Sequence, residues 1–333
     1  MSTENKLIRY RASICTIGLL VLFSCSKDDN ILVEEPDYTT LTYVVEDNFN
    51  LSHLFFALGR TGLDEELVKP GPYTLLASSN TGFQNAGLGS QTQLFNLPVG
   101  VLSQRMQYHI IPGKVSFRDL PLAANQEIMT MTGKPVYVSK VAQDQDTLTL
   151  INGAELAMED FEASNGYLQV VNGFLQPFVY ENVIDNIVNL PELTMFYRAI
   201  QNAGLEDRIR NAQGQTIYAP NNAAFVAAGY ADLRALDAED PVILRQRLLM
   251  HIVGERLFMQ DYILLAEVTA NTYQQKMLDE SIVTINMSRR TGGLRPINSI
   301  TLRGPGNTGN VSVGERDLIT NNGIINIING VLQ

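Results

Sequence analysis

The sequence is poor in several residues on which particular kinds of site depend. Its 333 residues include no tryptophan, two cysteines and three histidines. So few cysteines and histidines leave little for a zinc site or a disulfide framework. Acidic residues outnumber basic residues by 35 to 24, and the net charge of −11 argues against general nucleic-acid binding, which needs a basic face. Neither the Gly-x-x-x-x-Gly-Lys phosphate loop nor the Gly-x-Ser-x-Gly turn of hydrolases occurs, so we expect no cofactor and no enzymatic activity.

The sequence does contain enough apolar material for stable cores. Hydrophobic residues make up 45% of the chain and charged residues 18%, a balance that excludes wholesale disorder. The length exceeds that of one ordinary domain and suits two.

The first residues have the order of a secretory signal. Lys6, Arg9 and Arg11 precede an apolar run over 14–23, which is too short to cross the roughly 30 Å hydrocarbon core of a membrane as a helix. The run ends in Leu-Phe-Ser-Cys at 22–25, which resembles the lipobox of bacterial lipoproteins, although phenylalanine is unusual at its second position. The resemblance implies a signal peptide over 1–24 and acylation of Cys25.

The residues after Cys25 indicate where the chain is delivered. Ser26, Lys27, Asp28 and Asp29 resemble the acidic export tag of Bacteroidetes lipoproteins. The resemblance implies a lipid-anchored protein of the outer membrane that faces the cell exterior, with residues 25–37 as lipidated N-terminus and acidic tether. The alternative is an ordinary membrane anchor followed by a solvated linker.

Cleavage of the signal changes the net charge and the number of free cysteines. Residues 1–24 carry three basic residues and one acidic residue, so their removal takes the net charge from −11 to −13. Cys15 leaves with the signal and Cys25 is used by the lipid. We therefore expect no free thiol and no metal site built on cysteine.

The rest of the chain is an internal repeat. Three short motifs recur after 142 residues, and a closing motif recurs after 157 residues, which gives the second copy 157 − 142 = 15 additional residues. The sequence therefore predicts two homologous domains, over 38–178 and 182–333, joined so closely that they touch. The recurring motifs are Gly62-Leu63-Asp64 and Gly204-Leu205-Glu206, Asn80 to Phe83 and Asn222 to Phe225, His109-Ile110-Ile111 and His251-Ile252-Val253, and Val171 to Leu175 and Ile328 to Leu332.

Each copy has a mixed pattern of helices and strands. Apolar spacing predicts helices over 51–58, 99–110 and 242–252, and a counterpart of the first near 196–205. Asn80 and Asn222 are predicted N-caps, and Asn152-Gly153 is typical of a hairpin turn. Strands are predicted over 73–77, 136–139, 147–151, 168–171, 216–219, 282–287, 297–302 and 324–328.

Three ordered motifs in both copies resemble the fasciclin domain family. They are Tyr-Ala-Pro-Asn-Asn-Ala-Ala-Phe at 218–225, Tyr-His-Ile-Ile-Pro-Gly at 108–113, and the closing Asn-Gly blocks at 165–175 and 322–332. The first copy lacks the proline of the first motif, and the second copy lacks the tyrosine and proline of the middle one. The resemblance implies an α+β fold, a β-sandwich or wedge flanked by helices, and roles in adhesion and extracellular binding rather than catalysis.

Several motif residues are candidates for a site. Tyr108, His109 and His251, with Asn80 and Asn222, could contact a ligand or, for the histidines, act as a proton switch. The alternative is that they satisfy backbone groups inside the fold, and the resemblance favours this structural interpretation.

Two charged stretches invite a binding interpretation. Met158 to Glu162 holds three carboxylates without the spacing of a calcium loop, so we expect a solvated acidic turn and no metal. The additional stretch of the second copy, about 287–310, carries Arg289, Arg290, Arg295 and Arg303 and no acidic residue. Arginine forks suit carboxylates and sulfates, so this stretch is a candidate surface for an acidic glycan or partner. The alternative is a solvated loop whose arginines pair with the acidic body.

The patterns together predict a cell-surface lipoprotein that binds proteins or glycans non-covalently. The alternative is an accessory lipoprotein of a glycan-uptake complex, with a SusC-like transporter and a SusD-like lipoprotein as partners. If the ligand is a glycan, Tyr137, Tyr167, Tyr262 and Tyr273 are the candidate stacking residues, since tryptophan is absent.

Overall fold

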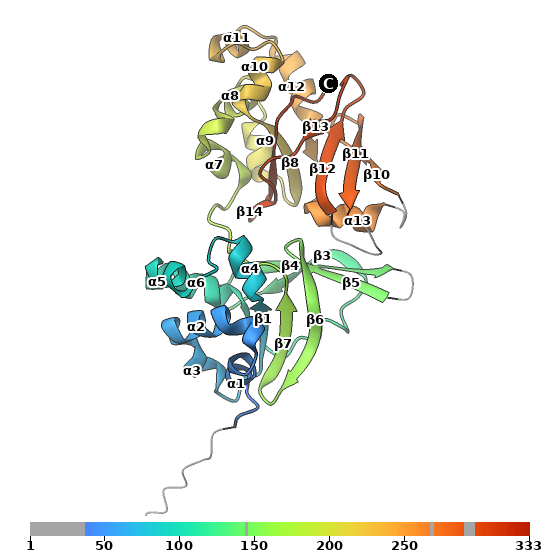
Figure 1. Ribbon diagram of the computed structural model, residues 1–333. Helices are drawn as coiled ribbons and strands as arrows, with labels where there is room; N and C mark the ends of the chain where they lie inside the picture. Colours follow the sequence, from blue (N-terminus) through green and yellow to red (C-terminus); the bar gives the residue numbers. More distant parts are fainter. Residues whose placement is uncertain (1–36, 144–145, 267–269, 290–296) are drawn as a thin grey trace, which may run out of the picture. The chain divides into compact units, whose positions relative to one another are not determined.

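The computed structural model describes residues 37–143, 146–266, 270–289 and 297–333, which belong to one compact unit. Within it two domains follow one another along the chain (Figure 1). The predicted lipidation site Cys25 and the tag residues Ser26, Lys27, Asp28 and Asp29 lie outside the described residues.

The first domain begins with helices and ends with strands. Its helical segments are α1 (Leu41–Glu46), η1 (Phe49–Leu51), α2 (Ser52–Thr61), α3 (Leu63–Leu67), α4 (Asn80–Asn85), α5 (Gln91–Asn96) and α6 (Val99–Tyr108). Its strands are β1 (Tyr73–Ser78), β2 (Ile110–Pro112), β3 (Ala123–Met129), β4 (Pro135–Gln143), β5 (Asp146–Ile151), β6 (Ala154–Ala163) and β7 (Gly166–Val171).

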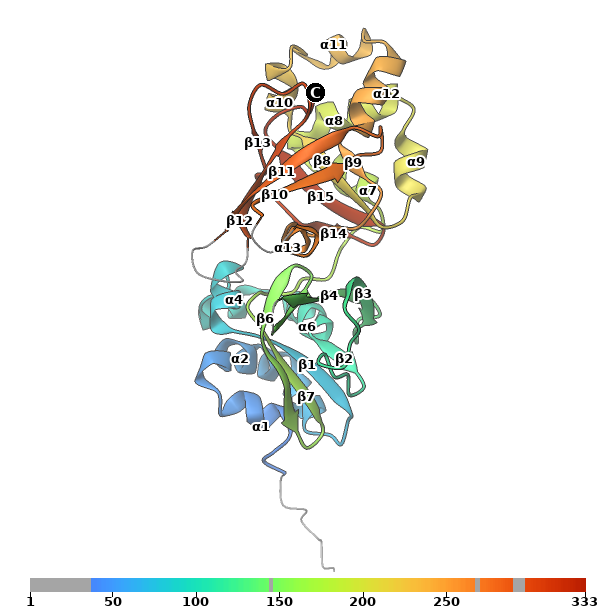
Figure 2. The ribbon, with the colours of Figure 1, turned by 90° about the vertical axis from the view of Figure 1, so that its right-hand side faces the viewer.

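These seven strands form one sheet in the order β2-β1-β7-β6-β5-β4-β3. Only β1 and β7 pair in parallel, and Figure 2 shows them side by side. The predicted turn at 152–153 joins β5 to β6, with φ of 47° at Asn152 and 76° at Gly153. Both residues tolerate the left-handed region, so a tight turn fits here.

The second domain repeats the order of elements with its strands in two sheets. The sheets have the orders β14-β15-β8-β9 and β10-β11-β12-β13. Its helical segments are α7 (Val183–Val188), η2 (Pro191–Leu193), α8 (Thr194–Asn202), α9 (Glu206–Asn211), α10 (Asn222–Ala227), α11 (Leu233–Asp237), α12 (Pro241–Leu249), η3 (Met259–Asp261) and α13 (Tyr262–Leu265). Its strands are β8 (Gln215–Pro220), β9 (Ile252–Val253), β10 (Thr272–Lys276), β11 (Ile282–Arg289), β12 (Ile297–Arg303), β13 (Val311–Ser312), β14 (Leu318–Thr320) and β15 (Gly323–Ile328).

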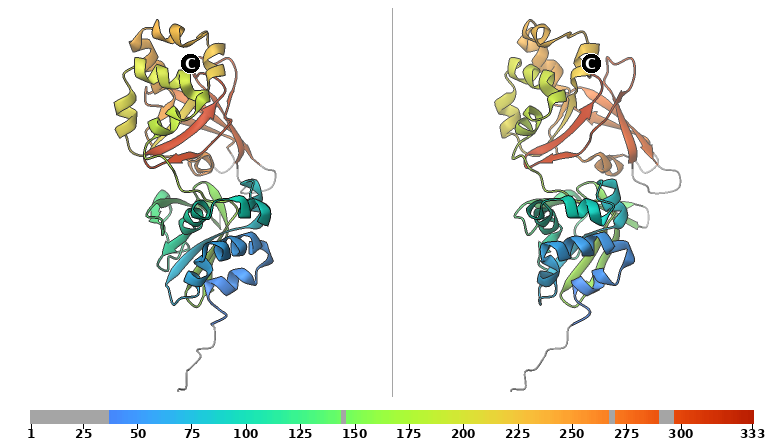
Figure 3. Two further views of the ribbon diagram at one scale, coloured as in Figure 1. Left: turned by 90° about the vertical axis from the view of Figure 1, so that its left-hand side faces the viewer. Right: turned by 60° about the vertical axis from the view of Figure 1, so that its left-hand side comes forward.

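The apolar residues that gave the helical spacing bury one face of each helix. In the first domain α2 and α6 cover one side of β1 and β7, with Leu54, Leu58, Leu102 and Met106 fully buried. Figure 3 shows most helices of each domain gathered on one side of its strands, while α13 lies apart from α7–α12, near β12 (Figure 1). Each buried leucine contributes roughly 1.5–3 kcal/mol through removal of apolar surface from water, so these faces fix the helices on the sheet.

Two helices end earlier than the apolar spacing predicts. The helix expected over 99–110 ends at Tyr108, and the one expected over 242–252 ends at Leu249. The apolar residues that follow belong to β2 and β9, which pair with β1 and β8. A short apolar run fits a buried helix end and a buried strand equally well, so periodicity alone does not separate them.

Candidate functional site

His109 and His251 lie at matching positions in the two domains and are completely buried. Nδ1 of His109 lies 2.8 Å from the carbonyl oxygen of Arg105, and the backbone N–H of Leu175 points at Nε2 from 3.2 Å. A carbonyl only accepts and an N–H only donates, so the proton sits on Nδ1. His251 repeats the arrangement with the carbonyl of Arg247 (2.8 Å) and the N–H of Leu332 (3.0 Å). We call each set a histidine clamp.

Burial lowers the pKa of each histidine from its ordinary value to about 4. An added proton on Nε2 would face the N–H of Leu175 or Leu332, so the charged ring would lose a hydrogen bond as well as its water. The two histidines are therefore neutral at pH 7, and each ring joins the last turn of its own helix, through Nδ1, to the closing segment of its domain, through Nε2. Tyr108 is also buried and donates its hydroxyl proton to the carbonyl oxygen of Pro135 (2.7 Å).

Asn80 and Asn222 are not N-caps, which corrects the prediction. The caps of α4 and α10 are Ser79 and Asn221. The side-chain oxygen of each accepts a hydrogen bond from the backbone N–H of the residue three positions further along the chain. Each predicted residue is the first residue of its helix, and its side chain reaches the neighbouring helix instead. Oδ1 of Asn80 accepts from the N–H of His53 (3.0 Å), and Oδ1 of Asn222 accepts from the N–H of Met195 (2.9 Å).

The acidic run at 158–162 is part of strand β6, not a solvated turn. Asp160 has a φ of 51°, and its carboxylate accepts from the N–H groups of Phe117 (2.9 Å) and Arg118 (3.0 Å). Hydrogen bonds from Gln169, Ser116 and these N–H groups outweigh desolvation, so the pKa of Asp160 is lowered. The carboxylate of Asp160 therefore uses its hydrogen bonds within its own domain.

Asp317 of the second domain repeats this role 157 residues later. Its φ is 55°, and its Oδ1 accepts from the N–H of Met259 (2.8 Å). Burial raises the pKa of Asp317 to about 7. Sequence analysis missed this pair, although 317 − 160 equals the offset of the closing motifs and was therefore available as a signal.

The predicted arginine surface falls mostly outside the described residues. Arg290 and Arg295 are not described, and of Arg289 only the backbone is described, as the end of β11. Arg303 is exposed on β12, and its Nε donates to the carbonyl oxygen of Asn307 (3.3 Å). The predicted binding role of this stretch remains a prediction.

The two domains contact each other through a largely buried interface. Tyr137 on β4 is 2% exposed, and its ring packs against Phe258 with centroids 6.2 Å apart. The guanidinium carbon of Arg256 lies 4.0 Å from the centre of the same ring. The turn residue Gly153 also approaches Phe258, since a Cβ at this position would lie 3.2 Å from the Cβ of Phe258.

Polar groups add to this interface. Nδ2 of Asn125 donates to the carbonyl oxygen of Arg256 (2.5 Å) and lies 3.3 Å from Oδ2 of Asp261. Asp261 is 1% exposed, and burial raises its pKa to about 6 against opposing hydrogen bonds that include the N–H of Phe258. Hydrogen bonds between side chain and backbone fix orientation as well as distance, so the two domains meet in a defined way.

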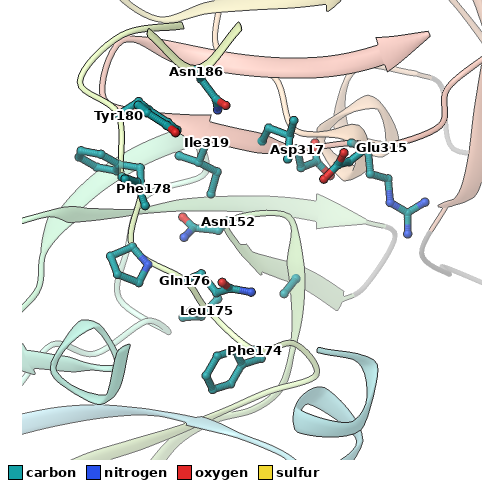
Figure 4. A pocket seen from close by; sticks show the side chains of 15 residues that line it. Asn152, Phe174, Leu175, Gln176, Phe178, Tyr180, Asn186, Glu315, Asp317 and Ile319 are labelled. Atoms are coloured by element: carbon teal, nitrogen blue, oxygen red, sulfur yellow. The ribbon is translucent and has the colours of Figure 1, made fainter. Parts of the chain in front are cut away.

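A cleft of about 470 Å³ opens beside this interface (Figure 4). One wall is the segment that connects the domains, and the other is the stretch that leads into β14. Neither contributed to the candidate residues identified from sequence. The lining consists of residues 174–180, residues 315–319, Asn152, Ala154 and Asn186.

The tyrosines proposed from sequence as stacking residues do not line this cleft. Tyr137 and Tyr262 are buried in the protein, and Tyr167 lies beneath the ammonium group of Lys114 at 4.3 Å. Tyr273 packs against Tyr262 with ring centroids 5.8 Å apart. The aromatic residues at the cleft are Phe174, Phe178 and Tyr180.

Two features of the described residues bear on site chemistry. Within the described ranges, no group of three or more histidine, cysteine or acidic side chains is placed to hold a metal ion. No helix in the same ranges is long and apolar enough to span a membrane.

Comparison with known proteins identifies the two repeats. The Fasciclin domain matches residues 49–177 and again residues 191–333. Rat (Rattus norvegicus) Stabilin-2 is 26% identical over 169 residues, which cover 47% of this chain and 11% of that protein. Pig (Sus scrofa) transforming growth factor-beta-induced protein ig-h3 is 27% identical over 142 residues, which cover 43% of this chain and 20% of that protein. The matched region therefore spans a fifth or less of the length of these two relatives.

Two further comparisons are with a bacterial protein and a solved structure. Protein sll1483 of Synechocystis is 28% identical over 140 residues, covering 41% of this chain and 73% of that protein. The solved FAS1 domain pair from the insect cell adhesion molecule Fasciclin I aligns with a TM-score of 0.40 and 16% identity, covering 85% of this chain and 97% of that one. The two matches to the Fasciclin domain cover most of the chain, which therefore belongs to the Fasciclin domain family and carries two of these domains in tandem.

Proposed function

We propose that this chain is a lipid-anchored protein of the outer membrane surface that binds an extracellular protein or glycan without chemical conversion. Membership of the Fasciclin family supports a binding role. The lipobox ending in Cys25 and the acidic residues 26–29 support anchoring and surface display. Two or more acyl chains hold a protein firmly in a bilayer, at about 0.8 kcal/mol for each buried methylene.

The observation that carries the proposal is a contrast between the buried reactive groups and the cleft. His109, His251 and Asp160 each spend their hydrogen-bonding capacity on groups of their own domain. An acid–base catalyst needs at least one such group available to substrate. The cleft combines aromatic rings and amides with Glu315, Arg316 and Asp317, and Oδ1 of Asp317 is held by the N–H of Met259, a lining that suits binding.

The experiment starts from the full chain with an affinity tag after Gln333, expressed in its native membrane and labelled with radioactive palmitate. We expect the wild type to incorporate label, to sediment with outer membranes and to retain a partner after purification in mild detergent. Cys25→Ala should lose both the label and the sedimentation, because the acylated residue is gone. The control Ser24→Ala preserves the cysteine and should behave as wild type.

The recovered partner separates the two versions of the proposal. A transporter of SusC type with a SusD-like lipoprotein, recovered in equal amount, would make the chain an uptake accessory. A surface glycan or another protein would make it an independent adhesin. Wild type that carries no palmitate would contradict the anchor, and wild type that retains no partner of either kind would contradict the binding role.

A further inference from the structure

We propose that the cleft between the two domains binds a short, neutral oligosaccharide, held by the amide of Asn186 and the ring of Tyr180. The inference rests on the proposed binding function and names its ligand class and site. The cleft volume of about 470 Å³ falls in the range of small-ligand sites, roughly 300–1,000 Å³.

Asn186 is the strongest single indication of a ligand. Its side chain is 9% exposed and lines the cleft from α7. Its amide has no hydrogen-bond partner within the part of the chain that the structure describes. In Figure 4 this amide points into the cleft beside Tyr180 and above Ile319. Although most of the residue is buried, its amide nitrogen and oxygen are open to solvent on the cleft side, so a ligand hydroxyl can take the place of water there.

The other domain shows that the fold does not need an amide here. Asn186 lies 142 residues after Val44, the offset that also relates Val183 to Leu41. Val44 packs against the apolar core of the first domain. A helix position that accepts valine in one copy and carries an unpartnered asparagine in the other serves something besides folding.

The remaining lining suits a sugar. An amide offers two donors and an acceptor, and a sugar hydroxyl both donates and accepts, so the two satisfy each other. The apolar C–H faces of a sugar ring pack against the faces of aromatic rings. Tyr180 is half-buried, and its ring has no ring or cation partner among the described residues, whereas Phe178 has the ammonium group of Lys134 over it at 4.5 Å.

The small net charge of the cleft suits a neutral ligand. Glu315 and Asp317 present carboxyl groups on the wall opposite Gln176, as Figure 4 shows. Arg316 also lines the cleft, and its guanidinium donates to the neutral carbonyl oxygen of Asn298 (2.9 Å), so its positive charge remains and offsets that of Glu315. Burial raises the pKa of Asp317 to about 7, so the cleft carries little net charge and offers no excess of positive charge to attract a carboxylate or sulfate.

An extended peptide is the less suitable occupant. Peptides add to sheets along a free strand edge, through a row of backbone hydrogen bonds. The strand at the cleft, β14, has three residues, and the N–H of Asn321 just beyond it already donates to the carbonyl oxygen of Tyr180 (3.2 Å). The free edge of β14 is therefore too short for a row of backbone hydrogen bonds to a peptide.

The test uses the full chain, purified in mild detergent through the tag after Gln333, on an array of neutral and acidic oligosaccharides. We expect wild type to bind one or more neutral oligosaccharides. Asn186→Val and Tyr180→Ala should each weaken that binding about tenfold or more, since an amide pair or a stacked ring is lost. Asn189→Val removes an exposed amide that follows the same helix and should bind as wild type.

Two results would overturn the inference: no binding to neutral oligosaccharides, or binding that survives both substitutions in the cleft. Val44 occupies the matching position of the first domain, so valine at 186 is expected to be compatible with folding. Thermal unfolding of each variant verifies that it is folded. If either result is found while a protein partner or an acidic glycan is captured, this inference falls and the proposed binding function stands.

Discussion

Alanine in place of His109 or His251 is expected to lower the free energy of unfolding by about 3–5 kcal/mol at pH 7.5. Each substitution leaves two buried backbone groups without partners, at about 1–3 kcal/mol each, and opens a cavity where the ring was. For His109 these groups are the carbonyl of Arg105 and the N–H of Leu175. Denaturant unfolding of the full chain measures the loss.

The difference in unfolding free energy between wild type and each histidine variant is expected to shrink as the pH falls. Each histidine has its pKa lowered to about 4 in the folded chain, below the ordinary 6.5. The stability that comes from keeping the ring neutral is therefore fully present above pH 6.5 and is lost as pH falls toward 4. Over that window wild type should lose about 3 kcal/mol for each histidine relative to its alanine variant.

His53→Ala is the matched control for the clamps. Its ring is only half-buried on α2, 6.0 Å from Phe83 between ring centroids, and no clamp depends on it. Its substitution should cost clearly less than either clamp substitution. A clamp variant as stable as His53→Ala, or a difference from wild type that does not shrink as pH falls, would show that the clamps do not hold the closing segments.

Tyr137→Ala is expected to loosen both domains although only one of them changes. The substitution removes a buried ring that Phe258 and Arg256 contact from the second domain, and large aromatic truncations cost about 3–5 kcal/mol. Hydrogen exchange should accelerate in β4 of the first domain and also in η3 of the second. Exchange mass spectrometry of the full chain resolves the two segments.

Tyr167→Ala tests whether the effect belongs to the interface. Tyr167 is half-buried on β7 and contacts Lys114 of its own domain. Its loss should accelerate exchange in the first domain and leave η3 unchanged. If Tyr137→Ala also leaves the exchange rate of η3 unchanged, the interface does not couple the two domains. The domains would then not form a defined cleft between them.

The sequence predicted the domains because the repeat preserves residues that both copies need. His109 and His251 recur at one offset, and each does the same work in its own domain. The strands expected in the second half of each copy are present, since alternating apolar residues and the Asn152-Gly153 turn are strong local signals. Local signals of this kind carry most of the fold.

The sequence predicted less about the site because the site depends on where two domains meet. Nothing local marks Asn186 as different from other helix residues, and only its comparison with Val44 at the repeat offset shows a polar side chain where an apolar one suffices. Similarly, Asp160 was expected in a solvated acidic turn, and nothing local drew attention to Asp317. Their partners lie more than forty residues away in the chain at Phe117 and Met259.

The most direct test of the central claim, that this protein binds another molecule through the cleft, is site-specific photocrosslinking on intact cells. A photoreactive side chain replaces Gln176, which is exposed and lines the cleft, or Gln91, which is exposed on α5 and does not line it. The account predicts an adduct at 176 that is absent at 91 and disappears with Asn186→Val. The same adducts at both positions, or an adduct at 91 alone, would contradict it.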